Sequence, residues 1–195
     1  FRVDGEYRDN RHPESVRFTP NIEEDLARRD FTVNAIAYSP RKGIVDPFGG
    51  VADIERRIIR CVGKPDKRFC EDGLRILRGL RFAATLGFDI DSDTADSVRR
   101  NRELLRGISA ERIYGDFTKL LCGEFAERIL KSFQETLRVF APDTDSAASA
   151  GIVSGVPNDK NLRLAAFLSL SGKESAELFM QSMKADGAAK KETVL

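Results

Sequence analysis

The sequence predicts an α+β fold that is mainly helical, with its strands in the first third of the chain. Residues 1–61 contain short alternating or β-branched runs separated by turn signals. From about residue 66 onward, apolar residues instead recur at the 3.6-residue period of a helix. The chain has 195 residues, of which 41% are hydrophobic and 32% charged, as is ordinary for a folded globular protein.

Residues 1–61 predict a small mixed region. Alternating residues in 1–20 predict two short strands around a turn-rich loop, and Asn21 is placed to cap a helix that reaches Asp30. The elements expected next are a turn and strand in 31–38, a strand at 44–46, a helix at 51–57 and a strand at 58–62. The glycine turn at 47–50 lacks the Lys-Ser/Thr of a P-loop, so it is interpreted as structural.

The rest of the chain predicts an array of helices. The stretch 71–82 is expected to form one helix, and Gly87 is expected to end it in the left-handed conformation. Further helices are predicted at 92–106, 109–121, 124–140, 159–170 and 173–184. Residues 141–157 are small and polar, which predicts a linker or long loop.

Composition argues against several kinds of site. The charges nearly cancel, with 32 basic and 31 acidic residues, so composition names no polyanionic partner. The cysteines are too few and too scattered for a disulfide framework or a zinc site. The single histidine, His12, lies in a polar turn, so a Ser-His-Asp triad has no support. No apolar run approaches the roughly 18 residues of a membrane span, and a cytoplasmic location is expected.

The most unusual stretch is E-D-G-L-R-I-L-R-G-L-R-F at 71–82, which spaces Arg75, Arg78 and Arg81 three residues apart. Like charges at this spacing on a helix repel by a few tenths of a kcal/mol per pair. One interpretation is a solvated face with ordinary ion pairs from Glu71 and Asp72 to Arg75. The other is a nucleotide site, because two carboxylates leave a surplus of guanidinium charge that a polyphosphate would neutralise.

Asp72 and Arg75 suggest a second use for the same helix. On one helix face they would present a hydrogen-bond acceptor beside a donor. Cytosine and adenine each show an amino group beside an unprotonated ring nitrogen, which matches that arrangement. Guanine and uracil show a ring N–H beside a carbonyl, which does not. The pair is therefore predicted to select C and A.

These motifs resemble the class II tRNA nucleotidyltransferases, which comprise the CCA-adding enzymes and their bacterial poly(A) polymerase relatives. The likeness rests on 71–82 and on five further motifs in order: R-R-D-F-T-V-N-A-I-A-Y (28–38), D-P-F-G-G (46–50), I-R-C-V-G-K-P (59–65), L-G-F-D-I-D-S-D-T (86–94) and I-S-A-E-R-I (108–113). It is close over residues 1–125 and looser beyond them. It implies the C-terminal part of a nucleotidyltransferase head (1–61), a helical neck (62–140), and a linker with the start of a helical body (141–195).

The resemblance also implies roles for individual residues. It places a nucleotide contact at Arg29, with Asp30 and Asn34 near the ribose. It assigns base reading to Asp72 and Arg75, and further nucleotide contacts to Arg78 and Arg81. The supporting residues that it implies are Arg68, Glu71, Glu111 and Arg112. Glu111 and Arg112 would buttress the base-reading helix from the start of another helix, although Glu111 also fits a simpler role on the helix dipole.

The implied activity is template-independent addition of C and A from CTP and ATP to tRNA 3′ ends, with Mg²⁺. The family holds its metal on carboxylates that precede the R-R-D motif, and no Asp-x-Asp precedes residue 28 here. Asp89-Ile90-Asp91 is expected in a turn after the base-reading helix, so it is not interpreted as that site. No catalytic or metal-binding residue is expected in this chain, and weak or no transfer is predicted for it alone.

Three further expectations complete the prediction. The chain begins Phe-Arg-Val-Asp without a methionine, which predicts a piece of a longer protein. The expected partners are ATP, CTP and the tRNA 3′ end, with no protein partner evident. The alternatives are a poly(A) polymerase or A-only adding enzyme, and a non-catalytic helical module that binds RNA or nucleotides. Asp116 departs from the family, which usually has glutamate there.

Overall fold

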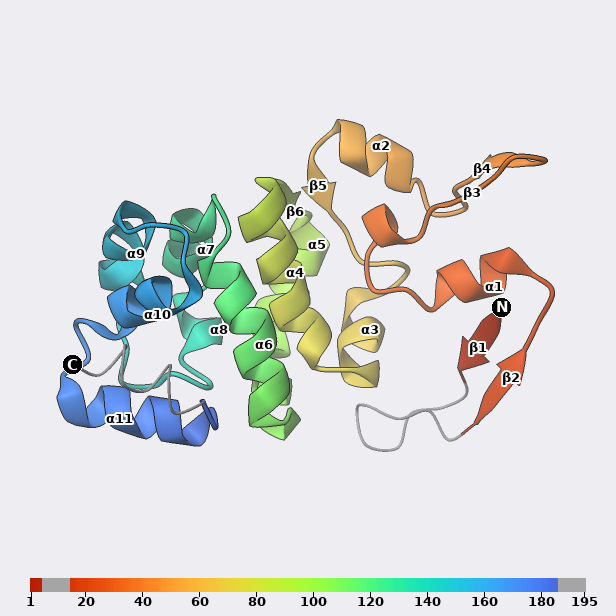
Figure 1. Cartoon of the computed structure of the whole chain (residues 1–195). Coiled ribbons are helices and arrows are strands. Elements are labelled where there is room, and N and C mark those ends of the chain that lie inside the picture. The colour runs from red at the N-terminus through yellow and green to blue at the C-terminus, as the bar shows by residue number, and fades with distance from the viewer. Residues whose placement is uncertain (5–14, 186–195) are drawn as a thin grey trace.

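The computed structural model describes residues 1–4 and 15–185, so His12 lies outside the described residues. Strands and short helices of the N-terminal part lie at one end of the molecule and an array of helices at the other (Figure 1). The predicted α+β, mainly helical fold is confirmed. No helix in the described part of the chain is both long enough and apolar enough to cross a membrane.

The strands of the described residues form three separate pairs. β1 (Arg2–Asp4) and β2 (Val16–Phe18) are antiparallel, as are β3 (Ala37–Ser39) and β4 (Gly43–Val45). β5 (Ile58–Ile59) pairs in parallel with β6 (Asp89–Ile90). The expectation of a turn at Asp89-Ile90 is therefore wrong, because the amides of Asp89 and Asp91 donate to the carbonyls of Arg57 and Ile59.

The N-terminal part contains α1 (Ile22–Ala27), the 3-10 helix η1 (Thr32–Asn34) and α2 (Gly50–Glu55). Asn21 caps α1 by accepting a hydrogen bond from the Glu23 amide at 3.0 Å. In the glycine turn, the Asp46 carboxylate accepts from the amides of Gly50 at 2.7 Å and Val51 at 2.9 Å. Those amides are thus used within the chain, which agrees with the structural interpretation of the turn.

The predicted single helix over 71–82 is wrong, because the chain breaks between α3 (Pro65–Glu71) and α4 (Leu74–Leu86). Asp72 is extended, with φ −153° and ψ 106°, and its Oδ1 accepts from the Leu74 amide at 3.1 Å. Aspartate competes in this way for backbone amides, and glycine is a poor helix former. Gly73 also fits a close approach, since a Cβ there would lie 2.9 Å from the Leu104 carbonyl oxygen.

The remaining helices follow the prediction with two subdivisions. Gly87 ends α4 in the left-handed conformation with φ 68°, as expected. The predicted helix at 92–106 is α5 (Ser92–Arg100) followed by the 3-10 helix η2 (Arg102–Gly107). The one at 124–140 is α7 (Ala126–Ser132) followed by α8 (Gln134–Leu137). The others are α6 (Ala110–Leu121), α10 (Lys160–Leu168) and α11 (Lys173–Ser182).

The predicted linker at 141–157 is wrong, because it contains α9 (Ser146–Gly155). Asp145 caps this helix by accepting from the amides of Ala147 and Ala148. Ser149, Ala150 and Val153 are completely or nearly completely buried. Their small side chains let α9 pack closely between α7 and α10. The small residues that predicted a loop therefore belong to a helix with a buried face.

One large core runs through the helical array and into the N-terminal part. Its members include Phe117, whose ring packs edge-on against Phe140 and Phe167 at centroid distances of 5.1 and 4.8 Å. The same core contains Phe31 and Ile59, which are fully buried and come from the N-terminal part. The core therefore fixes the segment that carries Asp30 and Asn34 against α4.

Candidate nucleotide-binding site

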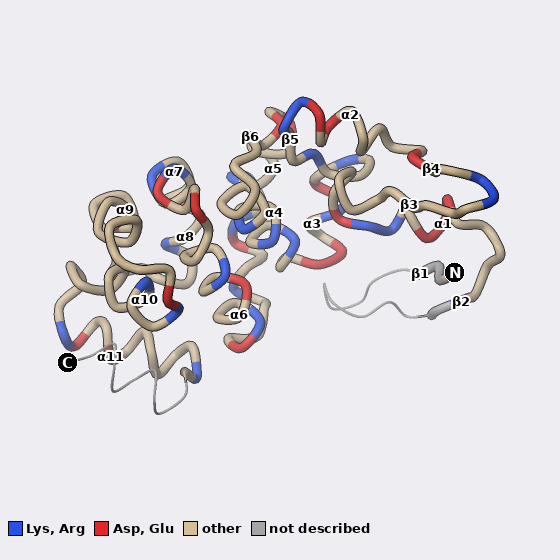
Figure 2. Tube along the Cα trace, turned by 45° about the horizontal axis from the view of Figure 1, so that its top comes forward, with Lys and Arg blue, Asp and Glu red and all other residues tan. Residues whose placement is uncertain are grey.

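Each of the three arginines of α4 has a carboxylate partner. Arg75 pairs with Glu71 at 2.6 Å, Arg78 with Asp30 at 2.7 Å, and Arg81 with Asp116. Figure 2 shows basic and acidic segments next to one another where α3, α4 and α6 meet. The inference that these arginines carry a surplus of positive charge is therefore wrong. It counted only the two carboxylates nearby in the sequence, Glu71 and Asp72. Asp30 and Asp116 supply the balance from segments distant in the sequence.

Arg75 is the most enclosed of these arginines, with 9% of its surface exposed. Besides Glu71, it donates to the carbonyl oxygens of Arg68 and Arg28, each at 3.2 Å. These contacts join the start of α4 to the main chain just before Asp30. They use three of the five N–H groups of the guanidinium, so Nε–H and one Nη2–H remain for another acceptor.

Asp30 joins the N-terminal part to α4. Its Oδ1 accepts from the Phe31 amide at 3.0 Å and from the Asn34 side-chain amide at 3.2 Å. Its Oδ2 accepts from Arg78 Nε at 2.7 Å. Asp30, Asn34 and Arg78, which the family resemblance assigned to one nucleotide site, therefore lie together.

Asp72 lies in the break between the two helices, so the expectation that it shares a helix face with Arg75 is wrong. Its ion-pair partner is Arg112 of α6, at 2.7 Å between Nη2 and Oδ2. The other Arg112 nitrogen, Nη1, is buried and has no hydrogen-bond partner in the described part of the chain. Each Asp72 oxygen accepts one hydrogen bond and keeps a second lone pair.

Three other expected residues also form ion pairs with described residues of the chain. Arg29 pairs with Asp25 of α1 at 3.0 Å and is about half exposed. Arg68 pairs with Glu71 at 3.1 Å and donates to the Ala27 carbonyl. The expectation that Glu111 buttresses the base-reading helix is wrong, because Glu111 is exposed and pairs with Lys184 at 2.7 Å. The hydrogen bond from Lys184 lowers the pKa of Glu111.

Two sets of groups in this network were not predicted from the sequence. Asp25 orients Arg28 and Arg29, and the spacings of three and four residues were a usable signal for that contact. The carbonyls of Ala27 and Arg28, which accept from Arg68 and Arg75, left no signal because any residue carries a carbonyl.

The carboxylates in this network do not fit Mg²⁺. No group of three or more His, Cys, Asp and Glu side chains among the described residues is arranged to hold a metal. A magnesium site needs carboxylate oxygens that are free to coordinate. Here each of the four carboxylates forms an ion pair with an arginine: Asp30, Glu71, Asp72 and Asp116.

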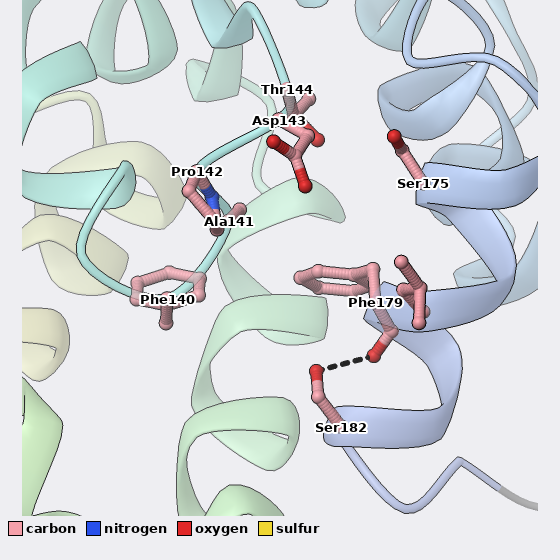
Figure 3. Close-up of a pocket in the computed structure, with 9 residues that line it drawn as sticks. Phe140, Ala141, Pro142, Asp143, Thr144, Ser175, Phe179 and Ser182 are labelled. Carbon is pink, nitrogen blue, oxygen red and sulfur yellow. Dashed lines mark hydrogen bonds between the residues drawn. The ribbon is translucent and has the colours of Figure 1, made fainter.

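A separate cavity of about 330 Å³ lies between the Phe140–Thr144 segment and α11 (Figure 3). Phe140 and Phe179 face it, and Ser182 Oγ donates to the Phe179 carbonyl at 2.8 Å. Among the described residues of its lining, Asp143 is the charged one, and none of them is cationic. The described lining residues therefore offer no cation for a nucleotide phosphate.

Two family models match the chain. The Poly A polymerase head domain matches residues 1–60, and the model described as the probable RNA and SrmB-binding site of polymerase A matches residues 87–147. The chain is 51% identical over 136 residues to the CCA-adding enzyme of Geobacillus thermodenitrificans, covering 70% of this chain and 34% of the relative. It is 37% identical to that of Bacillus velezensis, covering 96% of this chain and 49% of the relative.

Solved structures agree with these matches. The chain resembles the Bacillus stearothermophilus CCA-adding enzyme in complex with CTP, with a TM-score of 0.79 and 35% identity over 96% of this chain and 48% of that one. The Thermotoga maritima CCA-adding enzyme complexed with tRNA shares the fold, with a TM-score of 0.70 and 22% identity. The chain spans between a third and a half of the length of the curated relatives described above. It belongs to the family of class II tRNA nucleotidyltransferases and bacterial poly(A) polymerases.

Proposed function

We propose that this chain supplies the nucleotide-reading part of a tRNA nucleotidyltransferase that adds C and A from CTP and ATP to tRNA 3′ ends. The observation that carries the proposal is that Asp30 accepts hydrogen bonds from both Asn34 and Arg78, beside Arg75 and Asp72. Residues from two separate segments, each expected to touch the nucleotide, converge there. The names of the relatives and the CTP complex of one of them support the same activity.

Base selection uses the lone pairs of Asp72 and the N–H groups of Arg75 that form no hydrogen bond within the ion-pair network. Asp72 accepts the amino proton of cytosine or adenine, while Arg75 donates to the adjacent ring nitrogen. Arg112 holds the Asp72 carboxylate in place through its 2.7 Å contact. A guanine or uracil carbonyl would instead face the carboxylate, and two acceptors repel each other.

Binding of the phosphates requires an exchange of partners. Arg78 and Arg81 are oriented by Asp30 and Asp116, and a triphosphate replaces part of those contacts with charge-assisted hydrogen bonds. Arg29 is more exposed and adds a further cation from α1. The carboxylates thus hold the guanidiniums ready for a phosphate.

The transfer step belongs to the whole protein. In the family, Mg²⁺ supplies stabilisation of charge on the transferring phosphoryl group. Because the described carboxylates do not fit that ion, no step of the transfer is assigned to them. The tRNA 3′ end as the acceptor, and a cytoplasmic location, belong to the same proposal.

Calorimetric titration of the chain with each of CTP, ATP, GTP and UTP tests the site. We expect CTP and ATP to bind at least about tenfold more tightly than GTP and UTP, which corresponds to roughly 1.4 kcal/mol. Asp72→Asn should reduce this difference, since an amide can also donate to a carbonyl. Asp66→Asn, which changes an exposed carboxylate on α3, is the matched control and should preserve it. Equal binding of all four nucleotides would refute the proposal.

The alternative of a poly(A) polymerase or A-only enzyme predicts the same pair of base-reading groups. The curated relatives are CCA-adding enzymes, which favours use of both CTP and ATP. Incorporation of ³²P-labelled CTP into tRNA that lacks its CCA end, by a protein that contains this chain, distinguishes the two. Incorporation of AMP alone would establish the A-adding alternative, and no incorporation would favour the non-catalytic binding module.

A further inference from the structure

The ring of Phe82 lies beside the two arginines that are expected to bind the phosphates. The guanidinium carbon Cζ of Arg78 is 5.5 Å from the ring centroid, and that of Arg81 is 4.5 Å from it. The face of an aromatic ring is electron-rich and attracts a cation within about 6 Å of its centre. Phe82 is therefore a partner that both guanidiniums share, in addition to the separate carboxylates of Asp30 and Asp116.

The position of this ring is set by the core. Phe82 packs against the fully buried Phe31, with ring centroids 5.8 Å apart and ring planes at 81° to each other. This edge-to-face arrangement is a favoured one for aromatic pairs. Phe31 in turn lies against Gly79, where an added Cβ would be 2.9 Å from its ring. Because these contacts are apolar, they do not depend on which anion the arginines bind.

The ring and a phosphate use different parts of a guanidinium. A phosphate oxygen accepts hydrogen bonds from the N–H groups, which lie in the guanidinium plane. The ring instead attracts the positive charge and occupies none of those donors. Asp30 accepts from Arg78 Nε and so competes directly with an incoming phosphate, as Asp116 does at Arg81. Phe82 is therefore suited to hold both arginines before and after the exchange of partners.

We propose that Phe82 is a positioning residue for the triphosphate and fixes Arg78 and Arg81 for whichever anion they bind. The assignment rests on the proposed function, because that function makes these arginines phosphate ligands. It deepens that function by separating phosphate affinity from base choice. The base-reading pair, Asp72 and Arg75, is held by other groups. Phe82 should therefore affect how tightly every nucleoside triphosphate binds, and not which base is preferred.

Phenylalanines that carry one, two or three ring fluorines, incorporated at position 82, test this role. Fluorine withdraws electrons from the ring face and changes the size of the ring little. In calorimetric titrations with CTP and with inorganic tripolyphosphate, both dissociation constants should rise with each fluorine, by about two- to fivefold at three fluorines. The ratio of CTP to UTP affinity should not change. Phe133 is the matched control, because Arg99 lies 5.2 Å from its ring centroid but Phe133 follows α7, outside the nucleotide site. Fluorines at Phe133 should leave both constants unchanged.

Phe82→Leu provides a second measurement, since it keeps an apolar side chain but removes the ring face. It should weaken tripolyphosphate by about two- to fivefold, and Phe82→Tyr, which restores the face, should recover the affinity. A constant affinity across the fluorine series, an equal trend at Phe133, or a changed ratio of CTP to UTP affinity would overturn the inference.

The unsubstituted chain reports separately on the proposed function. A preference for CTP over UTP without any effect of fluorine would remove only the role of Phe82 and leave the nucleotide site in place. Equal binding of CTP and UTP by the unsubstituted chain would refute the proposed function and, with it, this inference.

Discussion

Arg75 shows how one side chain can serve both the fold and the site. It donates to Glu71 and to two main-chain carbonyls, one of them in the N-terminal part. A lysine could not reproduce these contacts, because its single ammonium lacks the planar fork of a guanidinium. The orientation of the Arg75 guanidinium is therefore set by Glu71 and by main-chain carbonyls, which lie outside the proposed base-reading pair.

At this scale the sequence predicted the contacts that depend on spacing and missed those that depend on the fold. The Glu71–Arg75 pair follows from a separation of four residues along one turn, and it forms across the helix break. The partners of Arg78 and Arg81 are 48 and 35 residues away, so local spacing carried no information about them. The expected roles of these residues in nucleotide binding stay predictions.

The three cysteines are expected to differ in reactivity. Burial raises the pKa of Cys61 to about 12, so almost none of it is thiolate at pH 8. Cys70 is exposed, and burial raises the pKa of the partly buried Cys122. With Ellman's reagent at pH 8 we expect Cys70 to react first, Cys122 more slowly, and Cys61 only after unfolding in denaturant.

Cys70→Ser is the control for this experiment. It should remove the fast phase and leave the slower one in place. A fast phase that persists in Cys70→Ser would contradict the burial of Cys61 or Cys122.

At the scale of elements, the break between α3 and α4 is the main difference from the prediction. The apolar period of 71–82 is helical, and it continues correctly through α4. Asp72 and Gly73 carried a signal for a break, since one competes for amides and the other disfavours helix, but the periodicity outweighed them. The helix α9 was not predicted, because its small residues form no amphipathic pattern with a helical period.

Gly79 and Gly115 are matched glycines in the interiors of neighbouring helices. A Cβ at Gly79 would lie 2.9 Å from the ring of the fully buried Phe31, whereas a Cβ at Gly115 would have no heavy atom within 4 Å. Gly115→Ala should therefore stabilise the protein by about 1 kcal/mol through helix propensity. Gly79→Ala should destabilise it by about 1–3 kcal/mol through overpacking.

Urea denaturation followed by circular dichroism at 222 nm measures both changes. Equal effects of the two substitutions would show that Phe31 does not pack against α4 as described.

At the scale of the whole molecule, the N-terminal part and the helical array are joined through α4. Phe31 and Ile59 belong to the same core as Phe117, and three arginines of α3 and α4 contact the segment 27–30. The predicted domain boundaries at 61/62 and 140/141 stay predictions, and the core crosses both positions. Sequence periodicity could not reveal this, because it reports which residues are buried but not which residues they meet.

The Arg78–Asp30 pair is expected to contribute measurably to the stability of this junction. Asp30 is buried, at 7% exposed, and Arg78 reaches it from α4. A double-mutant cycle with Arg78→Gln and Asp30→Asn should give a coupling energy of about 1–3 kcal/mol in urea denaturation. The exposed pair Arg17–Glu24 is the control and should couple by less than about 1 kcal/mol. A coupling near zero for Arg78–Asp30 would show that the junction is held by packing alone.

The burial of Phe31 against Gly79 has a consequence for how variants of this protein should be interpreted. Phe31 follows Asp30 directly, and its ring rests on the helix that carries Arg75, Arg78 and Arg81. A smaller residue at position 31 would leave a void under that helix and shift the guanidiniums relative to Asp30. A genetic screen for altered nucleotide choice should therefore recover substitutions in the hydrophobic interior as well as at polar positions. The proposed selection of nucleotides therefore depends partly on the packing of the core.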